Sequence, residues 1–293
     1  MTSSEKNSSI LFIYDHSLKT GNGHLRRCEY FSKIFPRRFN LEFKKYNSKI
    51  HSNLRRKIYD YIIIDSYEIN FSHEKKIRNF CKKLITIDDN YNRKFASDII
   101  INYSPLVKKK NYEKKIFKTS KLFLGKKFSF IKKKNFIKKI KKKHLNKNKL
   151  NIFIYFGTKD GSYLIKKILK RVSNKKIFKK IYVFDKKRII PHKIFLEKIK
   201  DSDLMLISSG VTLQEGLNMK KMIFATSFSK NQKNFYKYYK KKNLIKDLSN
   251  FNHFINFEIE KIHSILKKNQ LKIEKYFKQR INKKKMWSLI NNA

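Results

Sequence analysis

Short, unbroken apolar runs recur along this chain, and they restrict its fold more than any other feature. Examples are Ile10-Leu11-Phe12-Ile13 and residues 61–65 and 98–102. Apolar strands without polar alternation are buried on both faces, which is typical of parallel sheets covered by helices. Segments with helical spacing, such as 28–35 and 73–80, lie between the runs. The sequence therefore predicts an α/β fold. Further strands are predicted at 40–43, 84–88, 150–156, 180–184, 203–207 and 221–225.

The strand–helix series occurs twice, with a change of composition between the two series. Lysine runs dominate residues 106–149, and such runs are usually solvated surface or linker. A chain of 293 residues has room for two domains. We expect an N-terminal Rossmann-like domain at 1–147 and a C-terminal one at 148–293, which ends in helices. The two domains are expected to face a cleft.

The positive charge of the chain suggests an anionic partner. Lys and Arg number 73 against 22 Asp and Glu, a formal net charge of +51. Clustered cations bind nucleic acid or anionic membranes by releasing counterions. However, the enriched residues Lys, Ile, Phe, Tyr and Asn have codons rich in A and T, and the lysines are spread along the chain without a groove-reading element. We therefore favour a compositional origin and expect no specific nucleic-acid partner.

Cysteine content and hydropathy restrict the setting of the protein. The two cysteines, Cys28 and Cys81, lack paired spacing, which suits a reducing compartment and excludes a cysteine-based zinc site. The sequence shows neither an apolar run of membrane-spanning length nor a signal-peptide pattern at its start. The prediction is a cytoplasmic protein without a membrane span, monomeric or weakly oligomeric.

A glycine loop follows the first predicted strand and leads into a helix. Gly21 and Gly23 permit a tight turn and a close approach of a ligand to the main chain. The helix start offers N–H groups to an anion, and His24 at this point is a candidate general base. An ordinary strand-to-helix turn with a packing histidine is the alternative interpretation.

Polar residues end several of the predicted strands. In the first half they are 65–67, 88–90 and 102–103, and in the second half small-residue loops follow at 157–161 and 208–215. The carboxyl ends of parallel strands line the ligand crevice of open α/β sheets. Helix capping and turn formation are the alternative roles of these residues. Hydroxyl groups and backbone donors in 208–215 suit a phosphate.

With these loops in order, the chain resembles a known family, the UDP-2,4-diacetamido-2,4,6-trideoxy-β-L-altropyranose hydrolases of pseudaminic acid biosynthesis, which are related to GT-B glycosyltransferases. The resemblance covers most of the chain, from about Phe12 to Gln232. The matching motifs are Gly21-Asn22-Gly23-His24-Leu25-Arg26-Arg27-Cys28, Ile64-Asp65-Ser66-Tyr67, Ile87-Asp88-Asp89, Leu124-Gly125, Phe156-Gly157-Thr158-Lys159-Asp160, Gly210-Val211-Thr212-Leu213-Gln214-Glu215 and Asn231-Gln232. The chain departs from the family pattern at Ile13, Thr158 and residues 130–135.

The resemblance implies hydrolysis of a UDP-activated amino sugar to UDP and the free sugar, without a metal or cofactor. His24 is the implied base, and Asp15 either orients His24 or binds sugar hydroxyls. The implied UDP site lies in the C-terminal domain, where Glu215 is a ribose-binding carboxylate. The substrate-binding residues expected from the loops and the resemblance are Gly21, Asn22, Gly23, Arg27, Tyr67, Asp88, Asp89, Gly157, Ser209, Gly210, Val211, Thr212, Glu215, Asn231 and Gln232. A glycosyltransferase that uses a UDP-sugar donor is the alternative function, and a nucleic-acid-binding protein is a less favoured one.

Overall fold

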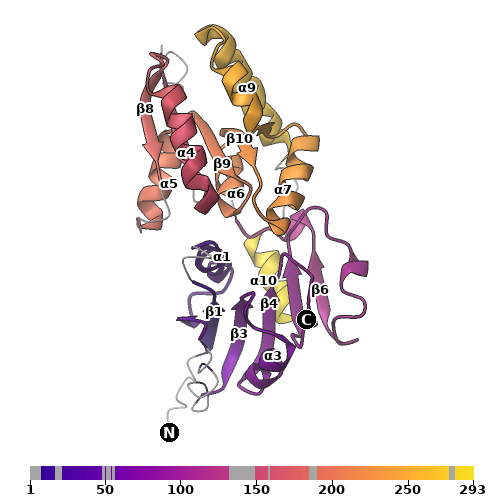
Figure 1. The fold of residues 1–293 in the computed structure, drawn as a ribbon. Helices are drawn as coiled ribbons and strands as arrows, with labels where there is room; N and C mark the ends of the chain where they lie inside the picture. The colour runs from indigo at the N-terminus through magenta and orange to yellow at the C-terminus, as the bar shows by residue number, and fades with distance from the viewer. Residues whose placement is uncertain are drawn as a thin grey trace. The chain divides into compact units, whose positions relative to one another are not determined.

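The computed structural model describes residues 8–16, 22–47, 50, 54, 57–131, 149–157, 159–184, 190–276 and 281–293. The chain divides into two compact units. The first unit comprises Met1–Phe130 and Arg280–Ala293, and the second comprises Ile131–Gln279. Figure 1 shows the last helix, in yellow, with the indigo and magenta elements of the first unit.

This division differs from the predicted one in two ways. The first unit ends at Phe130 and not at residue 147, and the last helix belongs to the first unit. The helix α10 (Lys283–Asn291) buries Met286 and Ile290 there. The Trp287 ring lies 5.3 Å from the Phe35 ring and 5.7 Å from the Tyr61 ring. An amphipathic helix is stable when its apolar face is covered, and the aromatic residues of the first unit cover this one.

In the described residues, the first unit contains one parallel sheet of six strands in the order β2-β1-β3-β4-β5-β6. Helices separate some consecutive strands, whereas residues 88–98 join two neighbouring strands without a helix. The elements are β1 (Ser9–Tyr14), α1 (Gly23–Ser32), β2 (Asn40–Lys45), β3 (Tyr59–Asp65), α3 (Phe71–Arg78), β4 (Cys81–Ile87), β5 (Ile99–Asn102), β6 (Lys121–Leu124) and short 3-10 helices at Lys109–Asn111 and Lys126–Phe128.

Different helices cover the two faces of this sheet. Successive residues of each strand point to opposite faces, so they pack against different helices. One face carries Leu11, Ile13, Ile62 and Ile64 in a core with Ile77 of α3. The other face carries residues such as Phe12, Tyr61 and Ile63. There, Phe12 and Tyr61 contact Phe35, just after α1, and α10 packs on the same side. This alternation decides which strand-end side chains reach α1.

The second unit contains a five-stranded parallel sheet in the order β11-β10-β9-β7-β8, counted over the described residues. Its strands are again fully buried at the centre, as their unbroken apolar runs predict. The elements are β7 (Leu150–Tyr155), α4 (Lys159–Val172), β8 (Phe178–Val183), α5 (His192–Asp201), β9 (Leu204–Ser208), α6 (Val211–Asn218), β10 (Met222–Thr226), α7 (Lys230–Lys241), β11 (Lys246–Asp247), a 3-10 helix at Leu248–Asn250, α8 (Phe251–Phe254) and α9 (Ile259–Tyr276).

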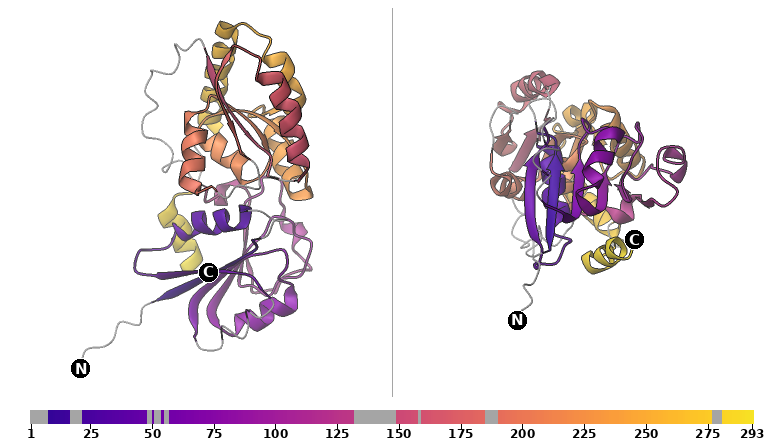
Figure 2. Two further views of the ribbon diagram at one scale, coloured as in Figure 1. Left: turned by 60° about the vertical axis from the view of Figure 1, so that its left-hand side comes forward. Right: turned by 90° about the horizontal axis from the view of Figure 1, so that it is seen from below.

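Helices also cover both faces of the second sheet. Ile165 of α4 and Ile262 of α9 belong to one core with alternate residues of β7, β9 and β10. In the left-hand view of Figure 2, α5 and α6 lie on the opposite side of the sheet from α4 and α9. A Cβ at Gly216 would lie 2.5 Å from the Met205 Sδ, so glycine allows α6 to approach β9 closely. The predicted α/β class with two parallel-sheet domains is confirmed.

Candidate active site

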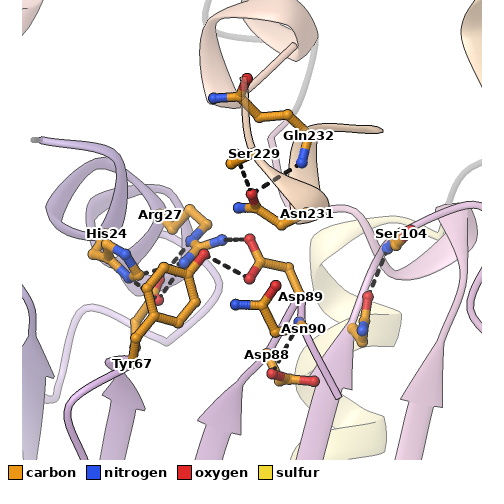
Figure 3. A network of polar contacts seen from close by, with 12 residues as sticks. His24, Arg27, Tyr67, Asp88, Asp89, Asn90, Ser104, Ser229, Asn231 and Gln232 are labelled. Carbon is orange, nitrogen blue, oxygen red and sulfur yellow. Dashed lines mark hydrogen bonds and ion pairs between the residues drawn. The ribbon is translucent and has the colours of Figure 1, made fainter. Parts of the chain in front are cut away.

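Two side chains of α1 meet two carboxylates at the carboxyl edge of the first sheet (Figure 3). His24 and Arg27 are three residues apart and therefore share one side of α1. Asp65 ends β3, and Asp89 follows β4, the neighbouring strand. All four residues are buried, with 4% exposure or less. The sheet and α1 together hold this polar cluster within the first unit.

The imidazole of His24 is fixed by Asp65. His24 Nδ1 lies 2.6 Å from Asp65 Oδ1. Arg27 Nη2 lies 2.9 Å from the same Nδ1 and 2.6 Å from the same Oδ1. If Nδ1 carried a lone pair, that lone pair would repel the carboxylate oxygen 2.6 Å away. An Nδ1–H group instead donates a hydrogen bond to this oxygen. We therefore place the proton on Nδ1. Nε2 then carries the lone pair, and it has no hydrogen-bond partner among the residues that the structure describes.

The guanidinium of Arg27 is occupied by the two carboxylates. Its Nε donates to Asp65 Oδ2 at 2.8 Å, Nη2 donates to Asp65 Oδ1, and Nη1 donates to Asp89 Oδ2. Burial alone would lower the pKa of Arg27, but Asp65 and Asp89 outweigh it and raise this pKa well above its ordinary value. Substrate binding by Arg27 stays a prediction, and its Nε, Nη1 and Nη2 groups already bind the two carboxylates.

Tyr67 forms the outer wall of the cluster. Its ring packs edge-on against the His24 ring, with centroids 4.5 Å apart, and its hydroxyl donates to Asp89 Oδ1 at 2.7 Å. Burial of the hydroxyl and the Asp89 charge raise the pKa of Tyr67 well above its ordinary value. The side chain is still 42% exposed. Tyr67 is thus the most exposed of these cluster residues, and substrate binding by Tyr67 stays a prediction.

Asp15 does not orient His24, which corrects one of the two roles expected for it. Its carboxylate accepts hydrogen bonds from Ser66 Oγ at 2.5 Å and from the Tyr67 N–H at 2.6 Å. Side chains alternate between the two faces of a strand. Asp15 is therefore on the same face as Leu11 and Ile13, which is the α3 side of the sheet. Asp65 is on the same face as Ile63, which is the α1 side. Asp15 therefore fixes the backbone that carries Tyr67.

Asp88 and Asp89 have different surroundings although they are adjacent. Asp88 accepts from the N–H groups of Asn90 and Tyr91 and from the hydroxyl of Tyr112. Burial and the neighbouring Asp89 raise the pKa of Asp88. The turn-forming interpretation is confirmed for Asp88 by these bonds. Substrate binding by Asp88 and Asp89 stays a prediction, and their carboxylates already have these protein partners.

The glycine loop before α1 is described only in part, since Gly21 lies outside the described residues. Asn22 precedes the first helical residue, and its Oδ1 accepts from His16 Nε2 at 2.6 Å. A Cβ at Gly23 would meet nothing within 4 Å. Open space therefore borders the start of α1 at Gly23, and ligand binding by Asn22 and Gly23 stays a prediction.

In the second unit, the predicted phosphate loop lies between β9 and α6. The hydroxyl and the N–H of Ser209 both donate to the Thr226 carbonyl, at 2.9 and 3.0 Å. Ser209 is fully buried and joins β9 to β10, so it does not have the exposed position expected of a phosphate ligand. A Cβ at Gly210 would meet nothing within 4 Å, and Val211 and Thr212 begin the helix. The first N–H groups of a helix have no acceptor within it, which suits an anion here.

Glu215, the expected ribose-binding carboxylate, is fully buried. His192 Nε2 lies 2.8 Å from its Oε1, and the His192 side chain is 20% exposed. The sequence gives no signal for His192, because its partner is 23 residues away and belongs to a different helix.

The remaining predicted residues lie in loops of the second unit. Gly157 follows β7 with a φ of +69°, a conformation that favours glycine. Asn231 Oδ1 accepts from Ser229 Oγ at 2.5 Å and from the Gln232 N–H at 2.9 Å (Figure 3). Gln232 Oε1 accepts from the Phe228 N–H at 3.0 Å. These bonds hold the start of α7, and ligand binding by these residues stays a prediction.

Two features are absent from the described part of the chain. No helix there is both long and apolar enough to cross a lipid bilayer. The same residues contain no group of three or more His, Cys, Asp or Glu side chains that could hold a metal ion.

Comparisons with known proteins agree with this architecture. No protein-family model matches the chain. An uncharacterised protein of Methanocaldococcus jannaschii, MJ1062, is 29% identical over 201 residues, which cover 58% of this chain and 41% of that protein. This chain therefore spans less than half the length of that relative.

Several solved structures share the fold over almost the whole chain. UGT89C1 of Arabidopsis thaliana in complex with UDP-L-rhamnose has a TM-score of 0.58 and 11% identity, covering 98% of this chain and 99% of that one. The glycotransferase of kitacinnamycin has a TM-score of 0.57 and 9% identity, with the same coverage. The calicheamicin glycosyltransferase CalG4 has a TM-score of 0.52 and 7% identity, covering 98% and 97%. The two parallel-sheet α/β units thus match the GT-B glycosyltransferase fold.

Proposed function

We propose that this protein hydrolyses a UDP-activated diacetamido-trideoxy sugar to UDP and the free sugar, with His24 as the general base. The observation that carries the proposal is the buried contact between His24 Nδ1 and Asp65 Oδ1. It orients the imidazole and leaves the Nε2 lone pair for a water molecule. A positioned general base typically accelerates a reaction by about 10²–10⁴-fold.

In the proposed reaction, the oxygen of a water molecule forms a bond to the anomeric carbon. The bond from that carbon to the β-phosphate oxygen breaks, and UDP leaves with the bonding electron pair. His24 Nε2 takes one proton of the attacking water. Asp65 remains ionised and stabilises the imidazolium that forms. Arg27 keeps Asp65 in place and partly balances its charge.

The second unit supplies the proposed UDP site. A diphosphate leaves readily when donors hold its charge. Open space beside Gly210 and the N–H groups of Val211 and Thr212 at the start of α6 support an anion site there. UGT89C1, which shares the fold, was solved with UDP-L-rhamnose, and this supports a UDP-sugar as the ligand class. The proposed contacts of Gly157, Asn231 and Gln232 belong to the same site.

The diacetamido-trideoxy sugar and its place in pseudaminic acid biosynthesis rest on the resemblance of the loop motifs. The strongest of these motifs contain His24 and Asp65, which the first unit brings into contact. In the same unit, Tyr67 is exposed, and we propose that it faces the sugar.

Product analysis tests the proposal. Purified protein is incubated with UDP-linked diacetamido sugars in H₂¹⁸O, and both products are examined by mass spectrometry. Attack at the anomeric carbon places ¹⁸O in the free sugar and none in UDP. Label in UDP would mean that water attacks phosphorus, which contradicts the proposed step.

The same assay separates hydrolysis from sugar transfer. A hydrolase releases UDP without an added acceptor, whereas a glycosyltransferase turns over only with an acceptor alcohol. UDP release that depends on the acceptor would replace the proposed function with the transferase alternative.

A further inference from the structure

The strand β2 forms one edge of the first sheet, and among the described residues it pairs with β1 alone. Backbone N–H groups of Asn40 and Tyr46 donate to carbonyls on the β1 side. Because backbone groups alternate in direction along a strand, those of Leu41, Phe43 and Lys45 point away from the sheet. This edge therefore offers three N–H groups and three carbonyls to another strand.

The edge is firmly held and partly apolar. The Phe43 ring stacks on the Phe12 ring of β1, with centroids 4.7 Å apart and an angle of 9° between the ring planes. Leu41 and Phe43 are nevertheless each 37% exposed. An exposed edge strand with large apolar side chains is a template for strand pairing with another chain.

The charges of β2 restrict how two copies of this strand pair. In an antiparallel pair related by a two-fold axis, an axis at Glu42, Lys44 or Lys45 places two like charges directly opposite each other. An axis at Leu41 leaves the outward groups of Lys45 unpaired. An axis at Phe43 places Glu42 of each copy opposite Lys44 of the other.

The axis at Phe43 also uses all outward backbone groups. Phe43 then lies opposite itself, and Leu41 lies opposite Lys45 of the second copy. The three outward N–H groups of each copy donate to carbonyls of the other, so the two strands share six backbone hydrogen bonds. Backbone geometry and charge therefore select the same register.

The other edge strands of the described sheets lack this pattern. The strands β6 and β8 carry lysines but no acidic residue, and β11 is two residues long. Among these edges, β2 alone combines several outward backbone groups with charges of both signs.

We propose that two copies of this chain form a homodimer by antiparallel pairing of β2 about a two-fold axis at Phe43. The pairing joins the two six-stranded sheets, and Glu42 and Lys44 attract each other twice across the axis. The formal net charge of +51 on each chain opposes association, so the Kd should lie between about 1 μM and 1 mM. This inference does not depend on the proposed hydrolysis.

Sedimentation velocity over a range of protein concentrations tests the dimer. At about 0.15 M salt the Debye length is about 8 Å, so distant charges are screened more than the cross-strand pairs. Glu42→Lys places lysines opposite lysines, and Lys44→Glu places carboxylates opposite carboxylates. Each change should raise the Kd about tenfold or more. The double variant exchanges the two charges and should return the Kd to within about threefold of the wild-type value.

These variants separate strand pairing from general charge repulsion. Glu42→Lys raises the net charge and Lys44→Glu lowers it by the same amount, yet both are expected to weaken the dimer. Lys76→Glu is the matched control, because it makes the same change of charge at an exposed lysine of α3. It should not raise the Kd. Thermal melts establish that each variant is folded.

Cross-linking tests the position of the axis. In an antiparallel hydrogen-bonded pair the Cα atoms are about 5.5 Å apart, which suits a disulfide. Phe43→Cys should therefore give a linked dimer when oxidised glutathione is added as the oxidant. Asn40→Cys, at an exposed position of the same strand, should not, because the two copies of residue 40 lie about 20 Å apart in this register.

Four results would overturn the proposal. A wild-type protein that sediments as a monomer at every concentration up to about 1 mM refutes the dimer. A Kd that both single charge variants leave unchanged assigns the contact to another surface. A double variant as weak as the single variants refutes the pairing of Glu42 with Lys44. Cross-linking of Asn40→Cys equal to that of Phe43→Cys refutes the axis at Phe43.

Discussion

Replacing Asp65 with Asn separates the catalytic role of this carboxylate from its structural role. The carboxylate of Asp65 accepts three hydrogen bonds, from His24 Nδ1, Arg27 Nη2 and Arg27 Nε. An amide offers one acceptor oxygen and one NH₂ group. If the NH₂ group faces His24, the imidazole must present its lone pair on Nδ1 and carry its proton on Nε2. If it faces Arg27 Nε instead, two donors oppose each other, so either orientation is unfavourable.

The expected losses of kcat and of stability in Asp65→Asn follow from the catalytic and the structural role of the carboxylate. The same change in a Ser-His-Asp triad lowers kcat by about 10⁴-fold by disturbing the histidine tautomer. We expect a loss of about 10³–10⁴-fold in kcat for Asp65→Asn, which corresponds to about 4–5.5 kcal/mol of activation free energy. Breaking a buried ion pair costs about 3–5 kcal/mol, and the amide keeps part of the hydrogen bonding. A stability loss of about 3 kcal/mol lowers the Tm of a unit of this size by about 6–12 °C.

The assay measures UDP release at a temperature at which every variant is folded, with thermal melts in parallel. Glu74→Gln is the matched control, because Glu74 is another fully buried carboxylate of the first unit and pairs with Arg93 Nη2 at 2.7 Å. It lies on the α3 side of the sheet and makes no contact with His24 among the hydrogen bonds described. We expect it to lose a similar amount of stability and less than threefold in kcat, about 0.7 kcal/mol. Equal losses of kcat in the two variants would refute the specific role of Asp65.

Three further predictions concern other parts of the molecule. Tyr67→Phe keeps the ring on His24 but loses the hydrogen bond to Asp89. Steady-state kinetics should show that kcat falls by less than about tenfold, and denaturant titration should show that the free energy of unfolding falls by about 1 kcal/mol. Wild-type stability of this variant would contradict the prediction. Ile290→Ala truncates a fully buried side chain of α10, so the free energy of unfolding should fall by about 2–5 kcal/mol. The unfolding transition can be followed by the fluorescence of Trp287, the single tryptophan. An unchanged midpoint would mean that α10 does not stabilise the first unit. For Asp247, burial opposes ionisation, but hydrogen bonds from Lys240 and other donors outweigh it and lower the pKa. Its stabilisation is therefore present above the unfolded pKa of about 3.9 and is lost as the pH falls through the folded pKa, so Asp247→Asn should be less destabilised by acid than the wild type in urea titrations at pH 7 and pH 3.

Much of the fold was predictable from the sequence because the apolar runs of the parallel strands are unbroken by polar residues. Runs such as Ile62-Ile63-Ile64 and Leu204-Met205-Leu206-Ile207 predict buried strands without an alternative. The domain boundary was harder to predict. The apolar residues Met286, Trp287 and Ile290 indicate an amphipathic helix, but the pattern does not say which unit covers its apolar face. That choice depends on an aromatic cluster built from residues far earlier in the chain.

The candidate site was predictable in its location but not in its pairing. The polar strand ends and the glycine loop point to the edge of the first sheet where His24, Asp65 and Asp89 lie together. The partner of His24 follows from strand alternation, since Asp65 has the same parity as Tyr61 and Ile63, which face the α1 side. Which side chains of β3 face α1 depends on the register between β1 and β3, and the sequence alone does not give that register. The contact between His192 and Glu215 had no comparable signal, because it depends on how two helices pack.

The most direct test of the account is the rate of UDP release from a UDP-linked diacetamido sugar by His24→Ala. The matched control is His73→Ala, which changes a histidine of α3 in the same unit whose Nδ1 contacts the hydroxyl of Tyr46. The account predicts that His24→Ala loses at least about 10²-fold in kcat while remaining folded, and that His73→Ala keeps wild-type activity. Unimpaired UDP release by His24→Ala would contradict the central claim that its imidazole activates the water.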